Sequence, residues 1–321
     1  MTEIFSKIVS CGSYLPKKIV TNADLAKTID TSDEWIFTRS GISQRHIAAE
    51  GEYTSDLGYH AAVNALENCD IDKEDIDVVI VATSTPDNIF PSTATKIQHK
   101  LGLKHCYAFD LQAVCSGFVY GLVVANALIK SGSAKNILLV GAETLSRIVD
   151  WNDRSSCVLF GDGAGAVIVS ANTQNDSGII SHALFSDGEY YDILKTTGGP
   201  SLTGGEGKIT MEGREVFKHA VGKMSESVKI ALKEANLDLS DVDLLIPHQA
   251  NQRIISAVGK KLGLEPNKVV STVKNHANTS AASIPLALDY ACKKNLISNN
   301  DIIVFEALGA GLTWGTVIYK W

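Results

Sequence analysis

Apolar residues in this chain recur in a fixed order of amphipathic segment, acidic turn and continuous apolar run, and that order occurs twice. Apolar residues at helical spacing favour an amphipathic helix, and a short run without polar residues is typical of a buried strand. The first copy comprises residues 55–68, 72–77 and 78–82, and the second comprises residues 213–235, 238–243 and 244–248. The chain therefore predicts two copies of one unit of helix and strand.

The same correspondence continues downstream of each copy. One further segment precedes a helix rich in small residues, and an apolar run follows that helix. These segments are residues 107–115, 116–130 and 136–143 in the first copy, and residues 269–278, 279–293 and 301–307 in the second. Strands that are apolar throughout and alternate with helices imply sheets covered on both faces. We therefore expect an α/β fold, a duplicated αβαβα sandwich with mixed central sheets.

The duplication divides the chain into an N-terminal half, residues 1–172, and a C-terminal half, residues 173–321. Segments at about 20–50 and 186–215 have no counterpart in the other half, and we expect them to be insertions over a substrate entrance. Open α/β sheets bind ligands where such units meet. A site built from both halves is therefore expected at their junction.

Composition excludes several classes of function. The chain has 321 residues, 45% of them hydrophobic, which is enough for two packed halves. A net charge of -7 gives no general attraction to nucleic acid or to an anionic membrane. The six cysteines form no C-x-x-C pair, which argues against a zinc site and a disulfide scaffold. No apolar run is long enough to cross a bilayer, so we expect a cytoplasmic protein with reduced thiols and no metal.

Cys115 stands where a strand gives way to a helix, and Ser116 and Gly117 follow it. A cysteine is more often a small buried hydrophobe, and we assign the other five to that structural role. At a helix N-terminus, however, the backbone N–H groups and the helix dipole favour thiolate over thiol. We therefore expect Cys115 to be a nucleophile whose own backbone N–H also helps to bind an oxyanion.

His248 and Asn278 are the candidate partners of that cysteine. His248 ends an apolar strand after Pro247, where a histidine is either a satisfied core residue or a site residue. Asn278 precedes Thr-Ser-Ala-Ala-Ser, where an ordinary helix N-cap is the simpler interpretation. The duplication places both near Cys115, and a neutral imidazole and an amide can each donate a hydrogen bond to one thioester oxygen. Together they would stabilise the enolate that forms when a neighbouring carboxylate leaves as CO₂.

Two glycine-rich segments precede late strands. Gly161, Gly163 and Gly165 suggest a nucleotide loop, but that loop must be followed by a helix, and a strand pattern follows here. We therefore interpret the segment as a turn between strands. The turn 309–311 precedes the last strand, and the N–H of Ala310 is the candidate for a second oxyanion donor. An ordinary hairpin is the alternative for both segments.

At these residues the chain resembles the thiolase-fold condensing enzymes, and most closely the β-ketoacyl-acyl-carrier-protein synthase III family. The likeness spans essentially the whole chain, and its most specific motifs are Thr31-Ser-Asp-Glu-Trp35-Ile, Thr38-Arg39-Ser-Gly41-Ile, Phe160-Gly-Asp-Gly-Ala-Gly, Pro247-His-Gln-Ala-Asn251, Asn278-Thr-Ser-Ala-Ala-Ser and Thr313-Trp-Gly. The resemblance implies a catalytic triad of Cys115, His248 and Asn278. Elongating synthases have a second histidine where this chain has Asn278, so the resemblance favours a starter enzyme.

The resemblance also implies binding residues. They are Thr31, Trp35, Arg39, Arg154, Ala250 and Asn251 for coenzyme A (CoA) and its pantetheine arm, Lys218, Gln249 and Arg253, with Lys260 and Lys261, for an acidic carrier protein, and Phe90 and Leu312 for the primer pocket. Trp35 and Arg154 would sandwich the adenine, and Phe90 would close the partner's pocket in a homodimer. Partial core burial is the alternative for Trp35, and a solvated helix face is the alternative for the two lysines.

The implied reaction is the decarboxylative condensation of an acyl-CoA primer, taken as acetyl-CoA, with malonyl-acyl-carrier protein through an acyl-Cys115 intermediate. It would initiate type II fatty acid synthesis, with the CoA thioester as substrate and no cofactor. One alternative is a specialised enzyme that uses branched or longer primers for alkylquinolones or polyketides. Another is a non-catalytic partner that binds a carrier protein. Ala277 and Ala310 stand where the family often has glycine, so a positive φ at either position would strain its loop.

Overall fold

Two mixed sheets form the frame of the protein in the computed structural model, which describes residues 4–174, 177–205 and 207–321. The first sheet has five strands in the order β1-β7-β6-β4-β5, and the second has four in the order β11-β12-β13-β8. Their bounds are β1 Phe5–Tyr14, β4 Val78–Ala82, β5 Tyr107–Leu111, β6 Asn136–Thr144, β7 Asp162–Asn172, β8 Gly178–Ser186, β11 Leu244–Pro247, β12 Ile302–Gly309 and β13 Thr313–Lys320. Each sheet contains both parallel and antiparallel strand pairs.

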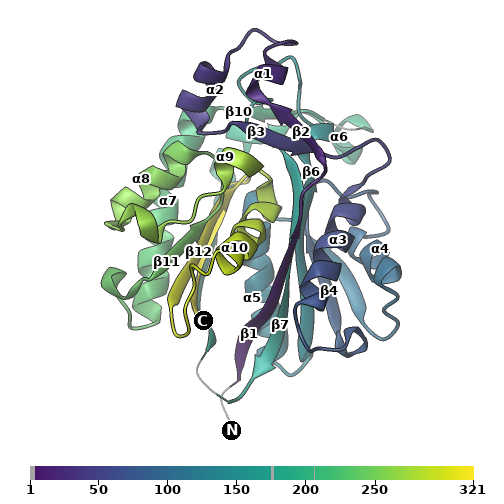
Figure 1. The fold of residues 1–321 in the computed structure, drawn as a ribbon, viewed down its shortest axis with the longest axis vertical. Helices are drawn as coiled ribbons and strands as arrows, with labels where there is room; N and C mark the ends of the chain where they lie inside the picture. The colour runs from purple at the N-terminus through teal and green to yellow at the C-terminus, as the bar shows by residue number, and fades with distance from the viewer. Residues whose placement is uncertain (1–3, 175–176, 206) are drawn as a thin grey trace.

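Helices cover both faces of both sheets. Helices α5 (Gly117–Lys130) and α10 (Ser283–Lys293) lie between the sheets, and their apolar side chains share one core cluster with strands of both. Helices α3 (Thr54–Glu67) and α4 (Thr93–Leu101) pack outside the first sheet, and α7 (Gly213–Glu234) and α8 (Gln252–Leu262) pack outside the second. The expected αβαβα sandwich with mixed sheets is confirmed (Figure 1). The division at residue 172 falls between β7 and β8 and stays a prediction.

Close contact between the first sheet and the segment that leads into α10 depends on two glycines. A Cβ on Gly141 of β6 would lie 2.4 Å from the carbonyl oxygen of Ala281. A Cβ on Gly165 of β7 would lie 2.7 Å from the backbone carbon of Pro285. These glycines let the end of α10 that carries the candidate site approach the strands directly. Gly163 and Gly165 lie in β7, so the predicted turn between strands does not extend to these two residues. The rejection of a nucleotide loop is confirmed, because the glycines lead along a strand and not into a helix.

The segments without a counterpart lie at one end of the sandwich, at the top of Figure 1. The first contains β2 (Lys18–Thr21), α1 (Asn22–Leu25), α2 (Asp33–Ser40) and β3 (Gln44–Ile47), and the second contains β9 (Leu194–Thr196), α6 (Pro200–Thr203) and β10 (Ile209–Met211). Short 3₁₀ helices occur at Lys73–Asp75, Val114–Ser116, Leu145–Arg147, Gly188–Ile193, Leu239–Asp241, Pro266–Lys268 and Ser280–Ala282. Among the described helices, none combines the length and apolar character needed to span a bilayer.

The duplication is incomplete at residues 269–278. The counterpart of β5 is reduced to an isolated bridge between Val269 and Leu245, and the chain then enters the short helix α9 (Val273–His276). The backbone N–H of Val270 still donates to the carbonyl of Leu245, 2.9 Å away, which holds the segment at the sheet edge.

A hydrogen bond also links the two sheets directly. The hydroxyl of Tyr319 on β13 accepts a 2.7 Å hydrogen bond from the N–H of Ile8 on β1.

Candidate active site

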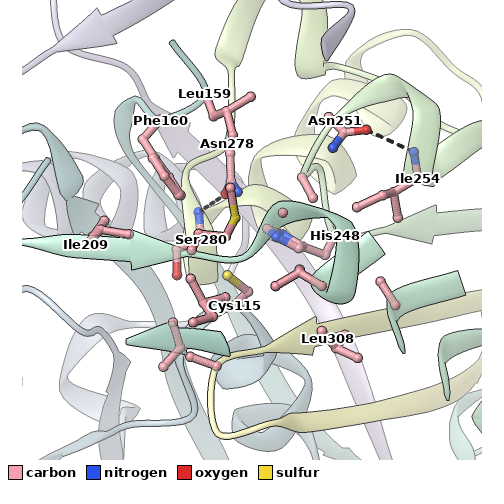
Figure 2. Close-up of a pocket in the computed structure, with 18 of the residues that line it drawn as sticks. Cys115, Leu159, Phe160, Ile209, His248, Asn251, Ile254, Asn278, Ser280 and Leu308 are labelled. Atoms are coloured by element: carbon pink, nitrogen blue, oxygen red, sulfur yellow. Dashed lines mark hydrogen bonds between the residues drawn. The ribbon is translucent and has the colours of Figure 1, made fainter. Parts of the chain in front are cut away.

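Cys115, His248 and Asn278 line one cavity of about 1140 Å³. Figure 2 shows the cysteine sulfur, the imidazole and the amide converging from three segments. Cys115 precedes α5 in the first half, His248 follows β11, and Asn278 precedes α10 in the second half. The structure therefore brings together the three residues that the sequence analysis placed at the junction of the halves.

Cys115 lies in the 3₁₀ turn at the start of α5, with Val114 before it at φ 49°. Burial raises the pKa of the Cys115 thiol to about 12, while Ser280 and the cysteine's own N–H act to lower it. The helix N-terminus by itself favours thiolate, as expected from the sequence. Desolvation opposes that effect, so the thiol form predominates at neutral pH.

One hydrogen bond fixes the backbone of His248, and another fixes its ring. Its N–H donates to the carbonyl of Glu306, 2.8 Å away, and its Nδ1 lies 2.7 Å from Ser283 Oγ. That hydroxyl oxygen also accepts from the N–H of Gln249 at 3.2 Å, which leaves its proton for Nδ1. We therefore assign the ring proton to Nε2. Burial lowers the pKa of His248 to about 3, so the ring is neutral and can donate.

Asn278 is fixed by its backbone and by one side of its amide. Its N–H donates to Leu159 at 2.9 Å and its carbonyl accepts from Gly161 at 3.0 Å. Its Oδ1 accepts from the N–H of Ser280 at 2.9 Å, which Figure 2 marks. The amide oxygen is thus used for positioning, and the NH₂ group is left as the donor on this side chain. The simpler interpretation, an N-cap, is wrong, because the N-cap residues of the following 3₁₀ turn and of α10 are Thr279 and Ala282.

The neighbouring Ala277 takes φ 59°, where an alanine is strained. Ala310 has no such φ; the positive value in its turn, 132°, belongs to Gly311. Ala310 lines the cavity together with Cys115. Gly309 packs so closely that a Cβ there would lie 2.8 Å from the backbone nitrogen of Cys115. The turn thus stands next to the nucleophile, where a second oxyanion donor is needed.

An aromatic ring and basic side chains stand at the mouth of the cavity. Trp35 and Arg39 of α2 line it, and the guanidinium carbons of Arg39 and Arg154 lie 4.5 and 4.9 Å from the centre of the Trp35 ring. Arg154 also donates to the backbone carbonyl of Asp30 at 2.7 Å. Stacked groups sit about 3.5–4.0 Å apart, so an adenine can enter between Trp35 and Arg154 only if the arginine moves outward.

Other expected binding residues are divided between the cavity and the surface. Ala250, Asn251 and Arg253 line the cavity, and Asn251 also caps α8 by accepting from the N–H of Ile254 at 3.0 Å. Thr31 does not line it, although its hydroxyl is buried without a partner among the described residues. Lys218, Lys260 and Lys261 are exposed, and Lys218 lies 3.6 Å from Glu215.

Two expected residues are placed elsewhere. Gln249 is fully buried, and its amide bonds the carbonyl of Pro247 at 2.7 Å and the N–H of Thr272 at 2.8 Å, so it cannot touch a docked carrier protein. The family resemblance implied contact with the carrier protein, but the Gln249 side chain instead holds two loops together. Leu312 is also fully buried, in the core cluster under α7 and α8, and does not line the cavity.

Several polar residues near the triad were not singled out in the sequence. Ser283 orients His248, and Ser280 approaches Cys115 and the buried Glu143. Glu143 accepts from Thr85 Oγ1 at 2.6 Å. Burial raises the pKa of Glu143, and the nearby Glu143 carboxyl in turn contributes to the raised pKa of Cys115. The spacing of hydroxyls two and five residues after Asn278 was the available signal for the two serines.

The comparisons with known proteins agree with this geometry. The family described as 3-Oxoacyl-[acyl-carrier-protein (ACP)] synthase III matches residues 109–188, and its C-terminal part matches residues 232–321. A β-ketoacyl-[acyl-carrier-protein] synthase III of Paramagnetospirillum magneticum is 56% identical over 319 residues, 98% of each chain.

Solved structures give the same assignment. The 3-oxoacyl-[acyl-carrier-protein] synthase III of Aquifex aeolicus has a TM-score of 0.94 at 46% identity, covering 98% of this chain and 100% of that one. The priming β-ketosynthase of the R1128 polyketide pathway has a TM-score of 0.92 at 33% identity, covering 98% and 96%. Identity of more than half over nearly the full length, with the same fold, is decisive: the chain belongs to the β-ketoacyl-acyl-carrier-protein synthase III family.

Proposed function

We propose that this protein condenses an acyl-CoA primer, acetyl-CoA in the first instance, with malonyl-acyl-carrier protein to give a 3-oxoacyl-carrier protein, CoA and CO₂. The reaction initiates fatty acid synthesis. The observation that carries this function is the meeting of Cys115, a neutral His248 and the amide of Asn278 in one cavity. A nucleophile and two uncharged donors are what transfer of an acyl group followed by decarboxylation requires.

The first half-reaction transfers the primer to the enzyme. The sulfur of Cys115 attacks the thioester carbonyl, and the N–H groups of Cys115 and Ala310 stabilise the tetrahedral oxyanion. The carbon–sulfur bond to CoA then breaks. The proton of Cys115 leaves with CoA as its thiol, so charge is balanced. The high pKa of the buried cysteine makes proton transfer part of this step.

The second half-reaction forms the carbon–carbon bond. Malonyl-carrier protein places its thioester in the same cavity, and its carboxylate leaves as CO₂. The electron pair becomes an enolate whose oxygen accepts hydrogen bonds from His248 Nε2 and Asn278 Nδ2. The enolate carbon attacks the acyl-Cys115 carbonyl and expels the thiolate, which takes a proton from solvent. Neutral donors suit this step because a charged imidazolium would bind the malonyl carboxylate and resist its loss.

Coenzyme A is held, on this proposal, by residues at the cavity mouth. Trp35 offers a ring face to adenine, and Arg39 and Arg154 offer planar cations. Asn251 and Ala250 line the path of the pantetheine arm. Thr31, whose buried hydroxyl has no partner among the described residues, is assigned to this group from the family resemblance. Outward movement of Arg154 accompanies adenine binding.

An acidic carrier protein would dock beside the mouth, on the outer face of α7 and α8. Arg253 lines the cavity, and Lys218 stands exposed on α7. A second hollow next to them is lined by basic residues from both helices, namely Lys218, His219, Lys223, Lys229 and Lys261, and by one acidic residue, Glu226. Local positive charge of this kind attracts an acidic partner although the whole chain is negative.

The proposed assembly is a homodimer. Ile89 and Phe90 are 72% and 83% exposed on the loop that follows β4, and Phe90 does not line the cavity of its own chain. Two adjacent large apolar side chains in solvent indicate a contact surface. In a dimer, Phe90 would complete the primer pocket of the partner.

Branched or longer primers are the second candidate. The cavity around Cys115 is apolar, with Leu145, Phe160 and Ile209 among its lining residues, and so can accept more than an acetyl group. The similarity to a polyketide priming enzyme points in the same direction. An assay that compares acyl-CoA primers of different length and branching is therefore needed to establish which primer the enzyme prefers.

Mass spectrometry of the intact protein after incubation with acetyl-, isobutyryl- or octanoyl-CoA tests the proposal. One acyl group should attach at Cys115, and Cys115→Ala should remain unmodified. Asn278→Ala should still be acylated but should fail to condense the acyl group with malonyl-carrier protein. Normal condensation by Asn278→Ala would overturn the assigned mechanism, and absence of acylation with every primer would overturn the function.

A further inference from the structure

The two loops that carry the oxyanion donors of the proposed mechanism come from segments far apart in the chain. Cys115 lies in the turn Val114–Ser116 before α5, and Ala310 lies in the hairpin between β12 and β13. A Cβ on Gly309 would lie 2.8 Å from the backbone nitrogen of Cys115 and 2.9 Å from the carbonyl oxygen of Ala113. The two loops therefore pack backbone against backbone.

Thr313, the first residue of β13, bonds to both loops. Its hydroxyl lies 3.0 Å from the carbonyl oxygen of Ala113 and 3.1 Å from that of Ala310, so its single proton is shared between two acceptors. Its own carbonyl accepts from the hydroxyl of Ser116, the residue after Cys115, at 2.9 Å. One threonine thus contacts both flanks of the nucleophile and the residue that carries the second donor.

The turn that places the backbone N–H of Cys115 is strained. Val114 takes φ 49°, a conformation that β-branched residues rarely adopt. Such a conformation persists only where surrounding contacts hold it. The carbonyl of Ala113 accepts from the N–H of Ser116 at 3.0 Å inside the turn, and from the Thr313 hydroxyl outside it. Loss of that hydroxyl would let the turn relax and would shift the N–H of Cys115.

Thr313 can hold this turn because the residues on either side of it are themselves fixed. Leu312 and Asp187 exchange two backbone hydrogen bonds, each of 2.8 Å. The ring of Trp314 stacks on that of Phe185 in β8, with 5.5 Å between the ring centres. The end of β8 and the residue that follows it thus support both neighbours of the threonine.

We propose that Thr313 is a positioning residue that sets the spacing between the N–H groups of Cys115 and Ala310. This inference rests on the proposed function, because it takes those two groups to bind the tetrahedral oxyanion. Each half-reaction passes through such an oxyanion, first at the acyl-CoA carbonyl and then at the acyl-Cys115 carbonyl. Removal of a whole oxyanion donor lowers kcat about 100- to 1000-fold, and a displaced donor should cost less.

The enolate site makes this proposal specific. In the proposed mechanism, decarboxylation of malonyl-carrier protein relies on His248 and Asn278, and neither residue bonds to Thr313 within the described part of the chain. Displacement of the two oxyanion N–H groups should therefore slow acylation and carbon–carbon bond formation, but not the loss of CO₂.

The test compares Thr313→Val, which removes the hydroxyl and keeps the branched shape, with Thr313→Ser, which keeps the hydroxyl. The maximal single-turnover rate of Cys115 acylation by acetyl-CoA should fall about 10- to 50-fold in Thr313→Val. The acetyl-CoA concentration that gives half of this rate should change less than about 2-fold, because no contact with CoA is removed. Thr313→Ser should stay within about 3-fold of wild type.

Release of CO₂ from malonyl-carrier protein should be measured in the Cys115→Ala background, where no acyl group can be accepted. Addition of Thr313→Val should change this rate less than about 2-fold. Ser116→Ala removes the reciprocal bond to the Thr313 carbonyl and is the second variant, which decides the matter if Thr313→Val does not fold. It should slow acylation about 3- to 10-fold and leave CO₂ release unchanged.

The matched control is Thr316→Val, because this buried threonine of the same strand bonds Ser227 of α7 at 2.8 Å. It should acylate within about 2-fold of wild type. Slow acylation with unchanged CO₂ release supports the proposal. Equal losses in both reactions, wild-type acylation by Thr313→Val, or the same loss in Thr316→Val overturns it. Failure of wild type to be acylated by any acyl-CoA would instead disprove the proposed function.

Discussion

His248 and Ser283 are joined by a hydrogen bond of 2.7 Å between the imidazole Nδ1 and the hydroxyl Oγ. The serine is the first residue of α10, so the helix that lies between the two sheets also sets the orientation of the ring. Its hydroxyl accepts from Gln249, which decides the tautomer that His248 presents to the cavity.

Replacing this serine should impair condensation more than acylation. Ser283→Ala removes the partner of Nδ1 and leaves the ring free to adopt the other tautomer, so we expect single-turnover condensation to slow about 10- to 100-fold. Acylation of Cys115 should change by less than about 3-fold. Ser225→Ala is the control, because among the described residues that buried hydroxyl bonds only Val221, at 2.8 Å within α7. Equal loss in both half-reactions would contradict the assignment.

Substitution of Asn278 by aspartate tests the donor role without removing the positioning contact. The aspartate keeps the oxygen that accepts from Ser280, but replaces the amide NH₂ with a second oxygen. An anion there would repel the enolate, so Asn278→Asp should condense at least about 100-fold more slowly. Rapid-quench measurement with pre-acylated enzyme would report this step. Wild-type rates in this variant would remove Asn278 from the mechanism.

The reactivity of Cys115 with an alkylating agent should rise with pH well beyond neutrality. Burial raises its pKa to about 12, so the thiolate fraction grows about 10-fold for each pH unit between 6 and 10. Iodoacetamide labelling followed by mass spectrometry gives the rate at each pH. A plateau below pH 8 would show that the helix N-terminus of α5 outweighs desolvation. His248, with its pKa near 3, adds no inflection in this range.

The close approach of α10 to the first sheet can be tested at Gly141. A Cβ there would meet the carbonyl of Ala281 at 2.4 Å, so Gly141→Ala should destabilise the fold by about 2–4 kcal/mol and slow condensation by displacing Asn278. Gly222→Ala is the control, because a Cβ at that position inside α7 would have no atom of the described residues within 4 Å apart from the helix's own backbone. It should stabilise by up to about 1 kcal/mol. Urea unfolding measures both.

Glu306 gives the stability a distinct pH dependence. Both of its carboxyl oxygens are buried without a partner among the described residues, and burial raises its pKa to about 8. Because the folded state holds the proton more tightly than the unfolded chain, this group favours folding fully below pH 4.5 and loses that effect as pH rises through 8. Glu306→Gln cannot ionise. It should be more stable than wild type by under about 1 kcal/mol at pH 5 and roughly 4 kcal/mol at pH 8. A constant difference in urea unfolding would refute this.

The repeated order of apolar and acidic segments was sufficient to predict most of the fold. Helix α7 was expected over 213–235 and spans Gly213–Glu234, and β4 was expected over 78–82 and spans Val78–Ala82. Apolar periodicity works here because each of these elements buries a full face. It failed at residues 269–278, where apolar residues suggested a counterpart of β5 and the chain forms only a bridge.

The catalytic residues were predictable because each stands at the end of an element with a clear pattern. Gln249 was misplaced because a polar side chain next to the triad gives no sign of whether it faces solvent or bridges two loops.

The hydrogen bond between Ile8 and Tyr319 constrains how the chain matures. Strand β13 covers the side of α5 that faces the second sheet, so that side stays uncovered while the ribosome adds the residues from Lys130 to Trp321. At ordinary elongation rates this lasts roughly 10–40 s. A nascent chain that already contains Cys115 is thus inactive and prone to aggregate until β13 is complete. Truncation even a few residues before the end of β13 should therefore give aggregated protein and not an enzyme of reduced activity.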